Sequence, residues 1–424
     1  MRTDLVTTID DRPRGLMAAC WWAYEHAPAG LETGLALARR YLAPWLSPRL
    51  PVRLHRLEGP QAGEIVSIGD AMTLSYLLQR LGPATVASTD HTGLLGLAPS
   101  LRRAIGTRDL ALASVPRILA GPLGRDCLRV PGLVSFRLPV GPTLEATLER
   151  ATTTVRRDAR RVLEGGVGWR ISRDPADFDR FYDGYYAPSV RLRFGDLGVL
   201  RERTMLRRQF RHGGALIWLE QQGRPIAGTV VQVRRGTLHG LVAAADPAQR
   251  HDGRAGPQFA LKIAAMALAP RLGASSVDLG GTVPSLRDGN MRAKRAFGAS
   301  VRRFEESHRE LLLAWRPGSF AARRLLHEAP LLIEAEGRLG AVAAPPPGAE
   351  ASPATAVQLW RQYAPEGLER LFLLGARTPV RLRTDGSEGD GPILLWPDTG
   401  AGALAEAMAR LECHARPPLA DGAP

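Results

Sequence analysis

Three consecutive apolar runs between residues 214 and 246 are separated by turns of only two residues. The runs read ALIWLEQ, RPIAGTVVQVR and TLHGLVAAAD, with the pairs Gln222–Gly223 and Arg235–Gly236 between them. A two-residue connection ending in glycine is a strong hairpin signal, because the favoured turns need backbone angles that glycine adopts at little cost. The segment therefore predicts a three-stranded antiparallel meander, around which the neighbouring elements have to be arranged.

The elements expected on both sides extend this meander into a mixed α/β domain. A strand at 167–172 and two helices come before it, and a Gly-rich turn after Asp246 leads into a helix that begins near Pro257. Proline at the start and glycine past the end are typical helix boundaries. A strand, a short helix and one or two closing strands follow, which gives a predicted core at 167–316.

The Gly-rich turn carries the first chemical signal. It reads RHDGRA from Arg250 to Ala255. Glycine lets the backbone approach an anion, and the helix that follows offers unpaired N–H groups and the positive end of its dipole. A plain strand-to-helix turn is the alternative interpretation. The predicted phosphate-binding residues are Arg250, Gly253, Arg254, Ala255 and Gly256.

A second motif follows: VDLGG at 277–281 and NMRAKRAFGA at 290–299. With the order of the elements and the Gly-rich turn, the chain resembles the GNAT superfamily of acyltransferases, in its FemAB-like and BioF2-like branch. The resemblance covers about residues 135–316, and Ala293 departs from it where the family often has an aromatic residue. The matched positions are Asp278, Gly280, Lys294, Arg295, Phe297, Gly298 and Ala299.

The resemblance implies a mixed α/β, GNAT-like fold: a tandem of a degenerate first lobe and a better-preserved second lobe, with a small C-terminal α/β appendage. No motif identifies the first lobe. The expected division is a helical segment at 1–48, the first lobe at 49–142, the second lobe at 143–340, a Pro/Ala-rich linker at 341–355, an appendage at 356–412 and a disordered tail at 413–424.

Lys294 is the principal catalytic candidate. Only two of the 56 basic residues are lysines, Lys262 and Lys294, so a lysine kept in this background suggests a need for an ammonium group. Such a group stabilises an oxyanion when an amine attacks a thioester or ester, or neutralises a phosphate. The alternative is a surface lysine packed over Phe297. Lys262, in the middle of a helix, is expected to be solvated.

Other polar residues are candidates for acid–base and substrate-binding roles. Asp278 would orient Lys294 or act as a base, or it caps the next turn. Asp246 is a base or a turn former. His239 faces the cleft or is a satisfied core histidine. The helix expected on the acceptor side contributes predicted substrate-binding residues, or packing: Tyr185, Tyr186 and Arg193.

Net charge and cysteine content limit the kinds of partner and the compartment that we expect. The formal net charge is +14, which favours nucleic acid, a phosphate-bearing cofactor or an acidic membrane surface, although an arginine bias also arises in a GC-rich genome. Three dispersed cysteines, Cys20, Cys127 and Cys413, predict no metal site and a reduced, cytoplasmic compartment. Neither a signal peptide nor a spanning helix is expected, and Trp21–Trp22 leaves peripheral membrane contact open.

The resemblance implies an N-acyltransferase that moves an acyl group from acyl-CoA to a small-molecule or envelope-precursor amine. Direct attack is expected, because no G-x-S-x-G nucleophile turn is present. One alternative is an aminoacyl-tRNA-dependent ligase whose basic helices hold the tRNA, and another is a non-catalytic scaffold in envelope or exopolysaccharide assembly. The arginines of those helices are Arg156, Arg157, Arg160 and Arg161, then Arg201, Arg203, Arg207 and Arg208. The acceptor, the acyl chain length, the general base and the oligomeric state stay open.

Overall fold

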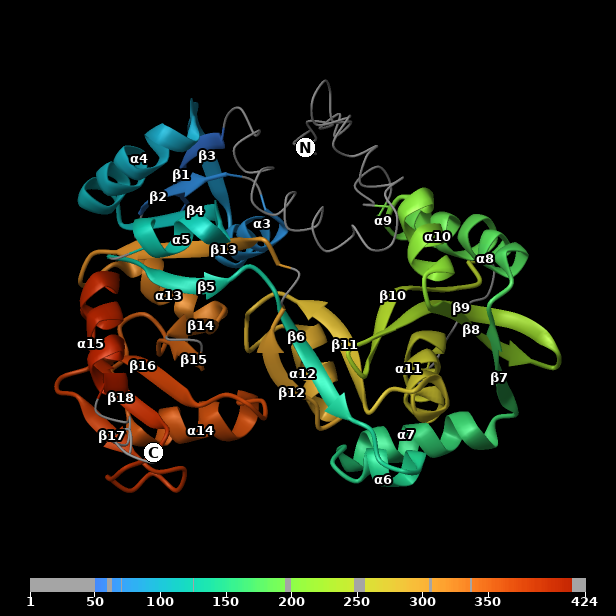
Figure 1. Cartoon of the computed structure of the whole chain (residues 1–424). Helices are drawn as coiled ribbons and strands as arrows, with labels where there is room; N and C mark the ends of the chain where they lie inside the picture. Colours follow the sequence, from blue (N-terminus) through green and yellow to red (C-terminus); the bar gives the residue numbers. More distant parts are fainter. Residues whose placement is uncertain are drawn as a thin grey trace, which may run out of the picture.

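The computed structural model describes residues 50–58, 63–69, 71–124, 126–194, 200–247, 256–304, 307–335 and 338–413. These residues form three β-sheets with helices packed on them (Figure 1). In the view of Figure 1 the first sheet lies at the upper left, the third below it and the second at the right. The expected segment 1–48 lies outside the described residues, as do residues 414–424 of the tail expected at 413–424, whereas Cys413 is the last residue of a helix.

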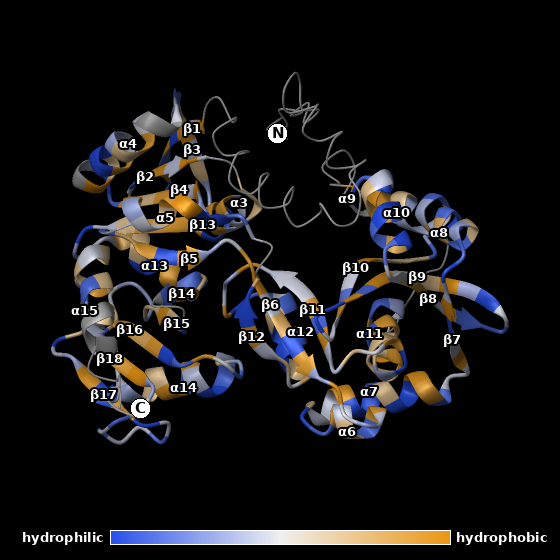
Figure 2. Cartoon of the chain, in the orientation of Figure 1, coloured by the Kyte–Doolittle hydropathy of each residue, from blue (hydrophilic) through white to orange (hydrophobic). Residues whose placement is uncertain are grey.

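The first sheet has the strand order β3-β1-β2-β4-β13-β5. Its central strand β4 is buried along its whole length, and its residues are mostly hydrophobic in Figure 2. The strands are β1 (Leu50–Leu57), β2 (Glu64–Ile68), β3 (Ala84–Thr92), β4 (Leu110–Pro116), β5 (Leu128–Pro131) and β13 (Arg309–Trp315). The helices are α3 (Met72–Arg80), α4 (Leu94–Thr107) and α5 (Arg117–Leu123).

The second sheet has the order β12-β6-β11-β10-β9-β8-β7 and contains the predicted meander as β8–β9–β10. Both predicted turns are confirmed: φ is positive at Gln222, Gly223, Arg235 and Gly236, as a two-residue turn with the twist of its strands requires. The strands are β6 (Val134–Pro139), β7 (Val167–Ser172), β8 (Gly214–Gln221), β9 (Arg224–Arg234), β10 (Thr237–Ala245), β11 (Ser276–Thr282) and β12 (Ser300–Arg303).

Helices cover both faces of this sheet. On one face, Ile263 and Ala264 share a core with Leu238 and Val277; on the other, an aromatic cluster packs around Trp218. Residues 144–164 hold two helices rather than one, because Thr152 caps a new helix start. The helices are α6 (Leu144–Leu148), α7 (Thr153–Glu164), α8 (Pro175–Phe181), η2 (Tyr182–Tyr186), α9 (Ala187–Phe194), α10 (Arg203–Arg211), α11 (Pro257–Leu268), η4 (Pro270–Leu272) and α12 (Gly289–Ala296).

The first two sheets exchange a strand. β6 follows β5 in the chain but inserts between β12 and β11, and β13 follows β12 but inserts between β4 and β5. Figure 1 shows β6 running from the first sheet across to the second. Sequence order had placed β6 in the first lobe and β13 in the second. The pairings show that each lobe needs one strand of the other, so the chain cannot be cut cleanly at residue 142.

The third sheet has the order β14-β15-β16-β18-β17, with β15, β16 and β18 parallel. The expected linker differs from the structure at its start: Ala341 to Ala343 complete a buried strand, because small apolar side chains fit a tightly packed sheet interior. The elements are α13 (Phe320–Glu328), β14 (Leu331–Ala335), β15 (Arg338–Ala343), α14 (Pro353–Tyr363), β16 (Arg370–Ala376), β17 (Val380–Leu382), β18 (Ile393–Pro397) and α15 (Ala401–Cys413).

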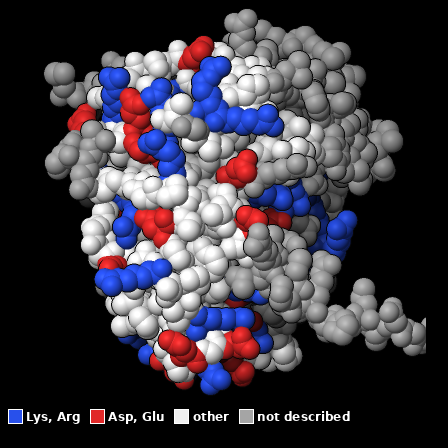
Figure 3. Space-filling model, turned by 90° about the vertical axis from the view of Figure 1, so that its left-hand side faces the viewer, with Lys and Arg blue, Asp and Glu red and all other residues white. Residues whose placement is uncertain are grey.

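Charges of both signs are interspersed on the face shown in Figure 3, which is the left-hand side of Figure 1. This face carries no broad patch of one sign, so the net positive charge does not gather there into an obvious anion-binding surface. None of the described helices is long and apolar enough to cross a membrane.

Candidate active site

Strands β10 and β11 part in the middle of the second sheet. They are parallel but pair over only three positions, Thr237–His239 with Ser276–Asp278. Just beyond, each strand has a bulge toward its other neighbour: Leu241 is the extra residue on β10, and the register of β11 shifts between Asp278 and Gly281. A bulge bends its strand. Two bulges at the same level therefore separate the strands where both still continue.

His239 and Asp278 form the last pair before the strands part. His239 Nδ1 lies 3.3 Å from Asp278 Oδ2, and Asp278 Oδ1 accepts a 2.7 Å hydrogen bond from the Gly280 N–H. Their neighbours Leu238 and Val277 point into the core against α11. Because side chains alternate along a strand, His239 and Asp278 lie on the opposite face. The sequence suggested both residues separately but not that they meet.

Lys294 reaches the bulge of β11 from α12. Its Nζ donates hydrogen bonds of 2.7 Å to both the Gly280 and the Gly281 carbonyls. Gly280 has a φ of 84°, which favours glycine and turns the backbone at the bulge. Burial, together with the charge of Lys262, lowers the pKa of Lys294 to about 8, against the opposing effect of Asp278 and Asp288. The surface alternative for Lys294 is wrong, since only 6% of the residue is exposed.

Asp288 positions the helix that carries Lys294, and sequence reasoning missed it. Its Oδ1 accepts the N–H of Met291, which caps α12, and the hydroxyl of Thr282 at the end of β11. Asp288 thus links the end of β11 to the start of α12. An aspartate before the start of a helical pattern is the signal that was available for it.

Lys262 is partly buried, whereas the sequence predicted a solvated side chain. It was expected in solvent, but burial lowers its pKa, and its Nζ lies 5.8 Å from the centroid of the Phe297 ring. Phe297 also contacts Phe259 of α11 at 5.4 Å between ring centroids. The chain's two lysines therefore lie close enough together for the charge of one to affect the other.

The predicted acceptor-side tyrosines have their hydroxyls engaged by the backbone. Tyr185 donates to the Pro225 carbonyl at 2.9 Å and lies 5.1 Å from the Trp218 ring between centroids. Tyr186 accepts from the Arg201 N–H at 3.1 Å. These contacts favour the packing interpretation, so substrate binding stays a prediction. Arg193 lies in α9, but its side chain is outside the described part of the structure.

Arg201 supports the bulge of β10. Its guanidinium donates to the Leu241 carbonyl at 3.1 Å, and the Tyr182 hydroxyl donates to the Arg201 carbonyl at 2.9 Å. Asp246 follows β10 directly, and its backbone N–H donates to the Ile226 carbonyl at 2.8 Å. Arg201 was predicted only as part of a nucleic-acid surface, because no local pattern shows that a side chain will bind a distant carbonyl.

The basic surface predicted on α10 is partly neutralised. Arg203 lies 3.0 Å from both Asp179 and Asp183, and Arg207 lies 3.1 Å from Asp179. Asp179 and Asp183 come from α8 and η2, which precede α9 and α10 in the chain. The arginine-rich spacing of α10 hid these pairings, since ion-pair partners on another helix leave no mark in a local pattern.

Of the predicted phosphate-binding residues only Gly256 is described; Arg250, Gly253, Arg254 and Ala255 lie outside the described residues. Gly256 is the N-cap of α11 in extended backbone, and Pro257 is the first helical residue, as predicted. In the described part of the chain, no three His, Cys, Asp or Glu side chains come together in a group that would hold a metal ion.

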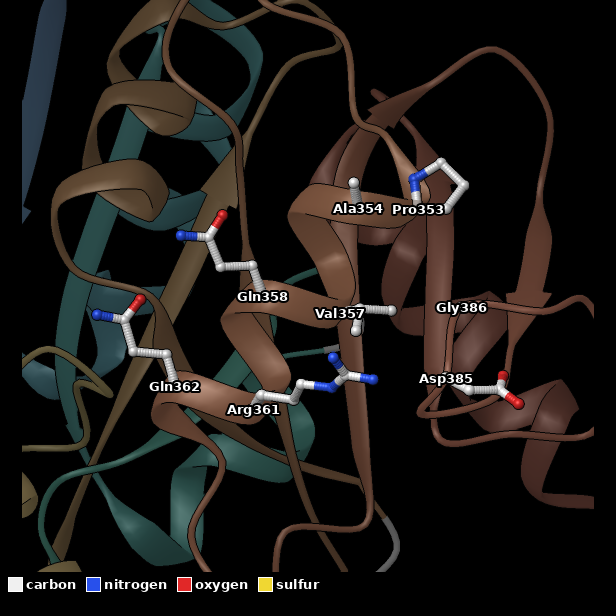
Figure 4. A pocket seen from close by; sticks show the side chains of 8 residues that line it. All are labelled: Pro353, Ala354, Val357, Gln358, Arg361, Gln362, Asp385 and Gly386. Atoms are coloured by element: carbon white, nitrogen blue, oxygen red, sulfur yellow. The ribbon is translucent and has the colours of Figure 1, made fainter.

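An open groove lies beside α14 on the third sheet, with a volume of about 810 Å³ (Figure 4). The side chain of Arg361 points across it toward Asp385. None of the predicted site residues lines this groove. Its lining is Pro353, Ala354, Val357, Gln358, Arg361, Gln362, Asp385 and Gly386.

Comparison with known proteins identifies the region that contains these residues. A family model described as an acetyltransferase (GNAT) domain matches residues 149–295. This range includes β7 to β11, Lys262, the His239–Asp278 pair and Lys294. The search of curated proteins found no match.

Solved structures show only distant likeness. FemX is 11% identical over 65% of this chain and 90% of that chain, with a TM-score of 0.34. L-PGS from Bacillus licheniformis is 12% identical over 62% and 80%, with a TM-score of 0.32. A GCN5-related N-acetyltransferase from Kribbella flavida is 13% identical over 65% and 93%, with a TM-score of 0.24. The family match is the informative finding: residues 149–295 of this chain are similar to an acetyltransferase (GNAT) domain.

Proposed function

We propose that the protein transfers an acyl group from acyl-CoA to an amine, by direct attack of the amine on the thioester. The observation that carries this proposal is the buried ammonium of Lys294, bound to two carbonyls of the β11 bulge within the acyltransferase domain. A fixed positive charge in a site of low dielectric stabilises negative charge far better than one in water.

Lys294 would act on the oxygen that becomes negative during the attack. Two of its three N–H bonds point at Gly280 and Gly281, so the ammonium is held in place and the third N–H can donate to a substrate oxygen. With a pKa of about 8 the group is mainly protonated at pH 7. The same charge would also neutralise a phosphate group of the donor. This is the second role that the position of Lys294 allows.

The donor would be held at the start of α11. Gly256 leads into the helix from the Gly-rich turn in extended backbone, an arrangement that suits a phosphate at a helix N-terminus. On this proposal Arg250, Gly253, Arg254 and Ala255 complete the site. Acyl-CoA supplies a thioester, whose carbonyl carbon is open to attack and from which CoA thiolate is a good leaving group.

The tRNA-dependent alternative has less support from the described residues. Arg203 and Arg207 are paired with carboxylates, which leaves fewer charges for an RNA backbone. The arginines of α7 are exposed, with Asp158 lying 3.5 Å from Arg157 and from Arg161. Binding that depends on such charges falls steeply as salt is added.

The first experiment is a thermal-shift and calorimetric titration with CoA, acetyl-CoA and a long-chain acyl-CoA. A ligand that binds only the folded state stabilises it by about 2.7 kcal/mol at 100 times its Kd. We expect a shift with at least one of them that a Gly253→Val variant loses. No shift, combined with salt-sensitive tRNA binding, would replace this proposal with the ligase; neither form of binding would favour the scaffold.

The second experiment follows CoA release with a pool of primary amines. Turnover identifies the acceptor class by fractionation of the pool. Binding of CoA without turnover with any amine would leave a CoA-binding protein and refute the proposed reaction.

A further inference from the structure

A row of polar side chains crosses the second sheet at the level where β10 and β11 part. Gln232 on β9, His239 on β10, Asp278 on β11 and Arg137 on β6 are partners in the register of adjacent strands. Partners in register point to the same face of a sheet. Four polar residues therefore stand side by side on the face opposite the α11 core.

Gln232 is bound to the backbone and to β9 itself. Its amide donates to the His212 carbonyl at 2.8 Å and accepts from Arg234 at 2.7 Å. In the middle of the row, His239 Nδ1 lies 3.3 Å from Asp278 Oδ2. The row thus contains one histidine–carboxylate pair at the point where the sheet opens.

Asp278 is arranged to orient the histidine rather than to accept a proton from a substrate. One of its oxygens faces His239 Nδ1 and the other accepts the Gly280 N–H. The residue is 8% exposed, whereas the side chain of His239 is 24% exposed. When Nδ1 gives its hydrogen to a carboxylate, Nε2 carries the lone pair that takes up a proton.

We propose that His239 is the general base of the acyl transfer and that Asp278 is its positioning residue. This inference rests on the proposed function. His239 Nε2 accepts a proton from the amine nitrogen as that nitrogen bonds to the carbonyl carbon of the donor. The carbon–sulfur bond breaks, and the proton passes to the departing sulfur, so the products are the amide and CoA thiol.

The other candidates for the base are bound differently. The Tyr185 hydroxyl donates to the Pro225 carbonyl. Lys294 is a hydrogen-bond donor to two carbonyls, and its charge suits the developing oxyanion. The groups that face the pair are Arg137 from β6, Gln232 from β9 and Lys294 from α12, whose charge interacts with Asp278. Lys294 and Asp278 both bind the backbone of Gly280. The oxyanion donor and the residue that positions the base would therefore be held by the same glycine.

The first test determines the tautomer of His239 in the absence of any substrate. The chain has nine histidines, and in ¹⁵N-histidine-labelled protein the signals that His239→Gln removes belong to His239. We expect hydrogen on Nδ1 and a lone pair on Nε2 at pH 8, and a changed tautomer ratio in Asp278→Asn. Hydrogen on Nε2 in the wild type, or no change in Asp278→Asn, would overturn the assignment.

The second test is kinetic and uses the donor and amine that give turnover with the wild type. His239→Gln should lower kcat about 10²- to 10⁴-fold and leave the thermal shift with CoA unchanged. Asp278→Asn should also be slow, and the double variant should be no slower than the worse single variant, because the two residues act as a unit. His91→Gln, an exposed histidine on β3, is the matched control.

The two proposals fail in different ways. A wild-type protein with no acyl transfer refutes the proposed function, and the tautomer measurement still decides whether the pair is formed. A wild type that turns over, with His239→Gln at the same rate and the same pH profile, refutes the base assignment alone. Circular dichroism and the melting temperature of each variant separate loss of chemistry from loss of fold.

Discussion

The first and second sheets pair their strands in the same pattern but differ at the centre. In each sheet a parallel pair, β2 with β4 or β10 with β11, has antiparallel pairings on both sides. There are two on each side in the first sheet, and two beside β11 and three beside β10 in the second. In each, the strand beside this pair comes from the other lobe. The tandem of similarly built lobes that the resemblance implied is therefore present. The two sheets therefore share a pattern of strand pairing. They differ in the residues that lie at the end of the parallel pair.

In the first sheet the two parallel strands do not separate in this way. β2 pairs with β4 from Ile65 to Ile68 and ends there, and most of these residues are fully buried and apolar. His55, on β1 of this sheet, is buried and binds Ser67 Oγ at 2.7 Å, and burial lowers its pKa below its usual value. It is a satisfied interior histidine, whereas His239 stands at the open end of a pair with a carboxylate.

The largest expected effect concerns the contact between the two lobes. Glu310, on the exchanged strand β13, is 2% exposed and lies 2.9 Å from Arg129, with Arg117 at 3.8 Å and Arg303 in contact. Arg303 also pairs with Glu334 of the third sheet. Removing one partner leaves buried charge uncompensated, so Glu310→Gln should lower the free energy of unfolding by about 3–5 kcal/mol, measured by urea denaturation.

The exposed pair Arg338–Glu369 provides the control for this prediction. Its atoms lie 3.2 Å apart with both side chains about half exposed, and such pairs contribute about 0–1 kcal/mol. Equal losses in Glu310→Gln and Glu369→Gln would show that the buried network does not join the lobes.

The next effect tests whether the chemistry belongs to the second lobe. Lys294→Met removes the ammonium but keeps most of the side-chain volume, and we expect kcat to fall about 10²- to 10³-fold. His55→Asn in the first lobe should leave kcat unchanged once its stability has been checked. Turnover by Lys294→Met at the wild-type rate would remove the main argument for the site.

A smaller effect follows from the burial of Lys294. Its pKa is about 8 in the folded protein and 10.5 for an ordinary lysine. Between these values the unfolded chain binds more protons, so stability should rise with pH, by up to about 1.4 kcal/mol per pH unit. The difference in unfolding free energy between wild type and Lys294→Met should show this slope from pH 8 to pH 10. Parallel curves would mean that the lysine is solvated.

The smallest effect separates two helix caps. Asp288→Ala and Asp174→Ala each remove an N-cap, of α12 and of α8, and each should cost about 1 kcal/mol of stability. Only Asp288→Ala should also lower kcat, because α12 carries Lys294. Equal activity in the two variants would show that the position of Lys294 does not depend on this cap.

Local sequence predicted the parts of the site that local forces determine. The turns at Gln222–Gly223 and Arg235–Gly236 follow from backbone preferences of a few residues, and the start of α11 at Pro257 follows from the geometry of proline. The strand with Asp278 and the helix with Lys294 were also placed correctly. What no pattern showed was that His239 and Asp278 would meet, since register between strands about 40 residues apart depends on the whole sheet.

The amino-acid sequence by itself determined the meander, the helix boundaries and the motif that ends at Lys294, because hydrogen bonds and backbone preferences within a few residues decide them. Only the tertiary structure decided the exchange of β6 and β13, the partial burial of Lys262, the strand in the expected linker and the bulges that separate β10 from β11. These features depend on contacts between residues far apart in the chain, where several pairings satisfy the same local pattern and packing selects one of them.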